Sequence, residues 1–230
     1  RVSAARAFLK PIKSRPGVDI RTECHVSKIL IKDNRATGVS YIKGGRKGLS
    51  RSLMARREVI VSAGTINTPK LLQISGIGPK KILNNLGIPV LIDLPGVGSN
   101  FRDHYGVRMV SHVKNIKTIN NMAQGAPLLI EIIRWLIKKP SLLAVSPSLA
   151  HIFWKSSKNL DNPDLMFVFT PASFREGVVG LLDKHPGMTC GVWQERPEST
   201  GYVNASSADP FIAPVIQPNY LAEETDRRIL

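Results

Sequence analysis

The sequence predicts a chain of the mixed α/β (α+β) class. Three patterns support this fold class. Residues 58–79 predict a strand, a tight turn and a helix in succession, the repeating unit of α/β proteins. Residues 18–61 contain short alternating segments between turn residues, typical of a β-meander. Residues 165–205 contain further short segments typical of strands, separated by prolines.

The strand–turn–helix unit is the central prediction. Residues 59–61 are β-branched, as expected of a strand buried on both faces, and residues 62–64 are small enough to let a ligand approach the backbone. Thr68 is predicted as the N-cap, Pro69 as the first helical residue and Gly76 as the helix stop. A helix start after such a turn suits an anion. The same unit also occurs without any ligand, so the local pattern leaves both interpretations open.

The remaining elements follow from alternation, turn residues and helical spacing. A basic hairpin tip is expected at residues 44–48. Predicted strands cover residues 18–22, 26–31, 38–42, 54–61, 88–92, 165–169, 189–193 and 202–205, and a short helix covers residues 80–86.

A second helix, predicted over residues 127–140, has apolar residues at helical spacing and two lysines in its last turn. A helix whose apolar side faces the core is the favoured interpretation, because Glu131 and Arg134 make only a thin polar face. The alternative is a helix lying on a membrane surface, with Trp135 and the lysines at the headgroups.

Composition narrows the class of protein. The chain has 230 residues and a net charge of +15, but its basic residues are dispersed and only 6% of residues are aromatic. We therefore expect a basic surface and no nucleic-acid partner. No apolar run reaches the length of a membrane span. Cys24 and Cys190 are expected to be buried, reduced thiols, and no histidine or cysteine spacing predicts a metal site.

Asp103 and His104 stand side by side and could suggest an acid–base pair. Neighbouring residues on an extended chain point to opposite sides, so we expect His104 to be a structural, hydrogen-bonding histidine.

Several blocks of the sequence resemble the glucose-methanol-choline (GMC) family of flavin oxidoreductases. The strongest is Gly64-Thr65-x-x-Thr68-Pro69-x-Leu71-Leu72-x-x-Ser75-Gly76-Ile77-Gly78, which resembles the second signature of the family without a gap. Other blocks are Arg1-x-Ser3-Ala4-Ala5-x-Ala7-Phe8-Leu9, Leu94-Pro95-Gly96-Val97-Gly98-x-Asn100-Phe101-x-Asp103-His104, Arg196-Pro197-Glu198-Ser199-x-Gly201 and Pro218-Asn219-Tyr220-Leu221. The residues of these blocks are most similar to those of the bacterial choline dehydrogenase-like and alcohol dehydrogenase-like branch.

The resemblance implies an internal piece of such an enzyme. It implies part of a Rossmann-like FAD-binding domain with a β-meander over residues 1–104, and part of an antiparallel-sheet substrate domain over residues 105–230. It places FAD against the backbone at Val26 and against Ala63 and Gly64. It implies no catalytic residue in this chain, since the proton-transfer His and its partner His or Asn are expected C-terminal to Leu230.

The activity implied is oxidation of a primary alcohol to an aldehyde, with an unknown electron acceptor. An uncharged alcohol is preferred over choline, because a strongly basic surface repels cations. The expected location is the cytoplasm, with peripheral association with the inner membrane as an alternative. The rival interpretation is a basic, non-enzymatic piece that binds anions or membrane surfaces, or a truncated product that is inactive alone.

Overall fold

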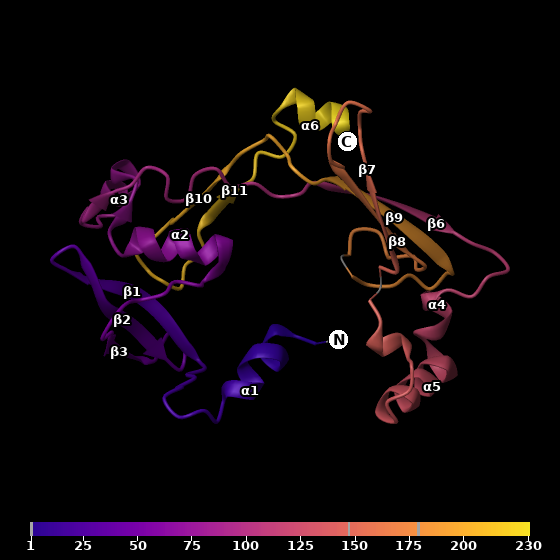
Figure 1. Cartoon of the computed structure of the whole chain (residues 1–230), viewed down its shortest axis with the longest axis horizontal. Helices are drawn as coiled ribbons and strands as arrows, with labels where there is room; N and C mark the ends of the chain where they lie inside the picture. The colour runs from indigo at the N-terminus through magenta and orange to yellow at the C-terminus, as the bar shows by residue number, and fades with distance from the viewer. Residues whose placement is uncertain (1, 147, 179) are drawn as a thin grey trace. The chain divides into compact units, whose positions relative to one another are not determined.

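The structure is a computed structural model that describes residues 2–146, 148–178 and 180–230 (Figure 1). It divides into two compact units. The meander unit consists of Ile12–Asp103 and Ser199–Ala222, and the sheet unit consists of Arg1–Pro11, His104–Glu198 and Glu223–Leu230. The first residue of the resemblance, Arg1, lies outside the described residues. The predicted domain division between residues 104 and 105 stays a prediction.

The meander unit packs one helix against a three-stranded antiparallel sheet of order β1-β2-β3 (Figure 1). A short parallel pair, β4-β5, and an antiparallel pair, β10-β11, complete it. The elements are β1 (Cys24–Lys32), β2 (Arg35–Lys43), β3 (Leu49–Met54), α2 (Gly64–Ile74), β4 (Ile77–Gly78), α3 (Lys80–Asn85), β5 (Ile92–Asp93), β10 (Tyr202–Asn204) and β11 (Val215–Gln217). The core joins β1 to α2, α3 and the segments beside them through Ile29, Leu71, Ile74, Leu83, Ile88 and Ala205.

Two buried polar side chains connect α2 to the rest of the meander unit. One is Gln73 in the helix and the other is its C-cap residue, Ser75. Ser75 accepts a hydrogen bond at its Oγ from the backbone N–H of Ile29, at 2.9 Å, which ties the helix end to β1. Gln73 has no exposed surface. Its Nε2 donates to the backbone oxygen of Val97 at 3.1 Å, and its Oε1 accepts from the backbone N–H of Ala205 at 2.6 Å. One side chain therefore joins three segments that are distant in the sequence.

The sheet unit contains a four-stranded antiparallel sheet of order β6-β9-β8-β7 (Figure 1). Its elements are η1 (Ala5–Leu9), α1 (Lys10–Ile12, which extends one residue into the meander unit), β6 (Gly106–His112), α4 (Ile119–Met122), α5 (Gly125–Leu136), η2 (Leu142–Ala144), β7 (Ala150–Trp154), β8 (Leu165–Thr170), β9 (Gly187–Gln194) and α6 (Glu224–Ile229). Strand β9 alternates buried and more exposed residues along its first half, so one face of the sheet is covered better than the other.

The structure corrects the prediction of a buried strand at residues 59–61. These residues form no strand, and Ile60 is 78% exposed. A strand needs neighbours that pair with it, and none of the described strands pairs with this segment. The helix also begins at Gly64 rather than after Thr68, which leaves Thr68 and Pro69 inside α2.

Other predicted strands are shortened or absent. Residues 18–22 form no strand, residues 88–92 are reduced to the two-residue strand β5, and the predicted strand over 54–61 ends at Met54. The predicted strand at 202–205 exists as β10, but it pairs with β11 in the meander unit instead of joining the large antiparallel sheet. The predicted strands over 26–31, 38–42, 165–169 and 189–193 are confirmed within β1, β2, β8 and β9.

The prediction of a core-facing helix after residue 127 is wrong. Helix α5 begins at Gly125, and its apolar residues are mostly exposed, while its one buried residue is the acidic Glu131. The spacing predicted the helix correctly, but the amphipathic pattern does not tell which side meets the protein.

Candidate functional site

A pocket of about 330 Å³ lies in the meander unit between the start of β1, α2 and the loop of residues 209–211. Two of the three residues predicted to contact a cofactor, Val26 and Ala63, are in its lining. The lining residues are Cys24, His25, Val26, Ala63, Asn67, Lys70, Leu71, Ile74 and Pro210. Gly64 follows Ala63 in the chain but is not part of the lining.

The backbone of Val26 faces the outer edge of β1. Glu23 accepts at its backbone oxygen from Gly44 on the β2 side, at 3.0 Å. Successive residues of a strand direct their polar groups to alternate edges, so those of Val26, three residues on, point away from β2. A bulge between Val26 and Lys28 then shifts the alternation, and the N–H of Ile29 again points outward, to Ser75. The N–H and C=O of Val26 thus form a donor–acceptor pair at an edge to which no described strand is bound.

The turn at Ala63 and Gly64 opens the other side of the pocket. Ala63 is the N-cap of α2 and offers no side-chain hydrogen bond to the helix start. Gly64 has a φ of +81°, a backbone conformation that side chains other than glycine rarely adopt. A Cβ at this position would meet no atom within 4 Å. Both residues are exposed, so space for a ligand remains beside this turn.

The loop of residues 209–211 is held against the pocket from two sides. The Nζ of Lys70 donates to the backbone oxygen of Pro210 at 2.5 Å, and the Nε2 of His25 lies 3.0 Å from the same oxygen. The His25 ring also stacks on Phe211, with centroids 4.4 Å apart. The guanidinium carbon of Arg46, at the hairpin tip, lies 5.9 Å from the centroid of the Phe211 ring. Arg46 also pairs with the carboxylate of Asp209.

The charges at the pocket are tuned by these contacts. Burial lowers the pKa of Lys70, and the nearby Asp209 carboxylate partly offsets that effect. The backbone N–H of Phe211 lowers the pKa of Asp209, and Arg46 lowers it further. The pocket therefore carries an ammonium group beside an apolar surface and a free backbone donor–acceptor pair, an arrangement that suits a flat heteroaromatic ring with polar edge groups.

His104 has a structural environment, as the sequence predicted. Its Nε2 lies 3.0 Å from the backbone oxygen of Glu195, and its ring stacks on Trp193 with centroids 6.3 Å apart. Asp103 accepts a hydrogen bond from the hydroxyl of Tyr220. Asp103 and His104 therefore contact different residues, which agrees with the expectation that they do not form an acid–base pair.

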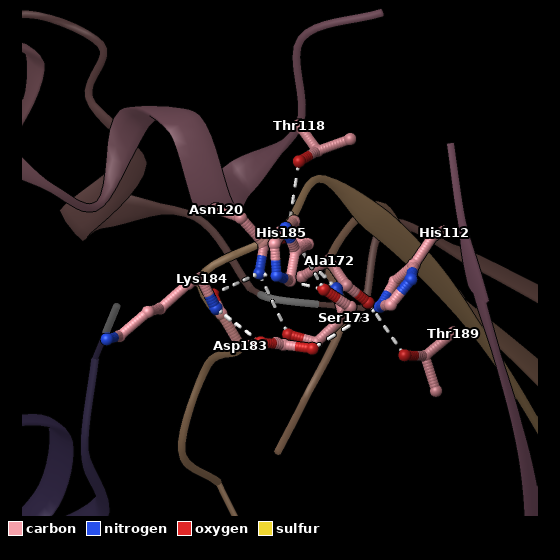
Figure 2. A network of polar contacts seen from close by, with 9 residues as sticks. All are labelled: His112, Thr118, Asn120, Ala172, Ser173, Asp183, Lys184, His185 and Thr189. Atoms are coloured by element: carbon pink, nitrogen blue, oxygen red, sulfur yellow. Dashed lines mark hydrogen bonds and ion pairs between the residues drawn. The ribbon is translucent and has the colours of Figure 1, made fainter. Parts of the chain in front are cut away.

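A second group of titratable residues, in the sheet unit, was not foreseen from the sequence. Figure 2 shows His112 beside Asp183, with Nε2 and Oδ2 3.3 Å apart, and the His185 ring 5.5 Å from that of His112. Asn120 donates to the backbone oxygens of both Ser173 and Asp183, at 2.9 Å each. These residues come from segments more than 50 positions apart, so no local spacing could indicate the group.

The contacts in Figure 2 serve the fold. Every polar contact of the buried Asn120 is with a neighbouring backbone or side chain. Within residues 2–146, 148–178 and 180–230, no three His, Cys, Asp or Glu side chains are placed to hold a metal ion. Cys24 and Cys190 are free thiols of intermediate exposure rather than fully buried ones.

The fold is a mixed α/β chain with antiparallel sheets and a pocket beside α2, and known proteins were compared with it. Residues 1–106 match the family model described as GMC oxidoreductase. An oxygen-dependent choline dehydrogenase of Staphylococcus saprophyticus is 34% identical over 228 residues, 99% of this chain and 40% of the relative. An alcohol dehydrogenase [acceptor] of Pseudomonas putida is 34% identical over 229 residues, 98% of this chain and 41% of the relative.

Solved structures agree with the sequence relatives. A formate oxidase of Aspergillus oryzae, studied for the modification of its FAD, matches with a TM-score of 0.85 and 26% identity, over 95% of this chain and 43% of that chain. The chain is thus similar to GMC oxidoreductases in sequence and in fold, and it spans about 40% of the length of the curated relatives it matches.

Helices long and apolar enough to cross a bilayer are absent from the described parts of the chain.

Proposed function

We propose that this chain is part of an FAD-dependent oxidoreductase that oxidises a primary alcohol to the aldehyde. The observation that carries the proposal is the pocket that joins Val26 and Ala63, two residues 37 positions apart, in a chain similar to the GMC oxidoreductases. The bound FAD would supply the chemistry, by accepting the hydride from the α-carbon of the alcohol.

The residues of the pocket fit the adenosine end of FAD. The outward N–H and C=O of Val26 match the donor–acceptor edge of an adenine ring. The exposed turn at Ala63 and Gly64 leaves room for the adjoining ribose and phosphate, beside a helix start without a side-chain cap. We assign no described residue to proton transfer; that step is proposed for a His and a partner His or Asn outside this chain.

The substrate is proposed to be an uncharged aliphatic or aromatic alcohol, since a net charge of +15 disfavours the approach of a cation. Choline is the second candidate, because several relatives at 34% identity are named choline dehydrogenases. Turnover of choline and of neutral primary alcohols by the protein that carries this chain distinguishes the two. A kcat/KM for choline above that for every neutral alcohol would reverse the order.

Two substitutions at one position test the cofactor contact. Val26→Pro removes the outward N–H, and because that group is outside the β1–β2 ladder the sheet should tolerate proline at this edge. The loss of one hydrogen bond is expected to weaken FAD retention about tenfold. Val26→Leu keeps the backbone and should retain FAD.

Flavin absorbance that survives desalting is the measurement, with far-ultraviolet circular dichroism to check the fold. Equal retention of FAD by both variants, with the fold intact, would contradict the contact at Val26. A parent protein that binds no flavin but binds anionic polymers would favour the rival, non-enzymatic proposal.

A further inference from the structure

Helix α5 presents its apolar side to solvent. Leu129, Ile133, Leu136 and Ile137 follow the spacing i, i+4, i+7, i+8, which places them on one side of the helix. All four are at least half exposed, and Leu136 is 65% exposed. Ile130 beside them is also more than half exposed. We call these five residues the α5 face.

The opposite side of α5 is fixed to the protein through its acidic residue. Glu131 is 8% exposed, and its Oε2 accepts from the backbone N–H of Leu142 at 2.6 Å. Its backbone oxygen accepts from the hydroxyl of Ser141 at 2.8 Å. Arg134 approaches the other carboxylate oxygen at 3.3 Å. These contacts set the rotation of the helix about its axis, so the outward direction of the α5 face is built into the fold.

The segment that contains this surface is rich in positive charge. Residues 114–139 contain five basic residues and a single acidic one, which is the buried Glu131. The basic residues Lys114, Lys117, Arg134, Lys138 and Lys139 are all exposed. Lys138 and Lys139 directly follow the last apolar residues of the helix, so their long side chains can extend to a plane above the apolar surface.

We propose that the α5 face docks on an anionic membrane surface, with its apolar side chains inserted among the lipid chains and its basic residues among the phosphates. An apolar side bordered by lysines is the pattern of a helix that lies in the membrane interface. Lipid phosphates complement these charges, whereas a second copy of the chain would bring the same positive charges together. The proposal is independent of the proposed alcohol oxidation, since it uses no pocket residue of the meander unit.

Sedimentation of the protein that carries this chain with lipid vesicles tests the proposal. The protein should bind vesicles that contain phosphatidylglycerol and bind phosphatidylcholine vesicles much more weakly. Replacing both lysines, Lys138→Gln and Lys139→Gln, should weaken binding to the anionic vesicles about 25-fold, at about fivefold for each lysine. Ile133→Asp should abolish it. Leu181→Asp, which alters an exposed apolar residue elsewhere in the sheet unit, is the matched control and should bind as the parent does.

A tryptophan measurement locates the contact. Leu136→Trp places a reporter on the α5 face, and vesicles with brominated acyl chains should quench the fluorescence that this residue adds. Added fluorescence of Leu136→Trp that these vesicles leave unquenched would overturn the proposal, as would equal binding to neutral and anionic vesicles. So would a parent dimer that Ile133→Asp converts to a monomer, since the α5 face would then bind a second copy. If Ile133→Asp does not fold, the exposed lysine pair decides the question.

Discussion

Gln73 shows how much of the meander unit depends on a single side chain. Gln73→Leu keeps the size of the side chain but leaves the oxygen of Val97 and the N–H of Ala205 buried without partners. Two such groups at about 1–3 kcal/mol each predict a loss of roughly 2–6 kcal/mol in the free energy of unfolding. Urea unfolding measures it. Asn85→Leu, at an exposed position of α3, is the control and should change the stability by less than about 0.5 kcal/mol; equal effects at the two positions would contradict this account.

Asp209 predicts a specific acid dependence. Its pKa is lowered in the folded protein, first by the N–H of Phe211 and then by Arg46. The carboxylate therefore stabilises the fold above its unfolded pKa of about 3.9, and this contribution is lost as the pH falls through the lower, folded pKa. Melting temperatures measured from neutral to strongly acidic pH should fall less steeply at the acid end for Asp209→Asn than for the parent. Asp161→Asn, at an exposed site in the other unit, should keep the parental slope. Parallel curves for Asp209→Asn and the parent would refute the role of this ion pair.

Residue types predicted the pocket only in part. Val26, Ala63 and Gly64 were indicated by the resemblance, and the structure brings the first two into one lining. The sequence did not indicate that His25 and Lys70 would meet the loop of residues 209–211, because the contact of Lys70 with Pro210 joins positions 140 residues apart. Sequence patterns report on near neighbours, and this loop is positioned by β10, β11 and the hairpin tip.

At the scale of elements, the turn after α2 makes the clearest prediction. Gly76 has a φ of +90°, and a Cβ there would lie 2.7 Å from the backbone oxygen of Pro89. Gly76→Ala should therefore lower the stability by about 1–3 kcal/mol, through backbone strain and displacement of the segment that leads to β5. Thermal unfolding measures the change. Gly96→Ala is the matched control, since its added Cβ would meet nothing within 4 Å and its φ is not positive. Similar melting temperatures for the two variants would show that the turn can relax.

Elements were predicted well where the signal was local and poorly where it depended on neighbours. The hairpin of β1 and β2 has its own turn and alternation, and both strands were found from the sequence. Residues 59–61 have the composition of a buried strand, yet no described strand pairs with them. Helix α5 has the expected spacing but the opposite orientation, because Glu131 finds partners in Ser141 and Leu142 that the helix sequence cannot reveal.

At the scale of the whole molecule, charge and exposed apolar surface act against each other. The described residues expose many large apolar side chains in both units, among them Ile60, Leu49 and Leu136 at 65% or more. Surfaces of this kind favour association, whereas a net charge of +15 keeps copies of the chain apart. The balance between the two effects should depend on salt, because screening shortens the range of repulsion from about 10 Å at 0.1 M to about 3 Å at 1 M while apolar contacts persist.

The 230-residue chain alone should therefore bind the dye ANS and form larger species as the salt concentration rises, measured by light scattering at constant protein concentration. Ile60→Lys, which adds charge at an exposed apolar site, should move the onset of association to higher salt. Lys47→Arg, which keeps the charge at the hairpin tip, should leave the onset unchanged. Salt that dissolves preformed assemblies would give the opposite sign and would mean that ion pairs, rather than apolar contacts, join the copies, because ion pairs weaken under screening and apolar contacts do not.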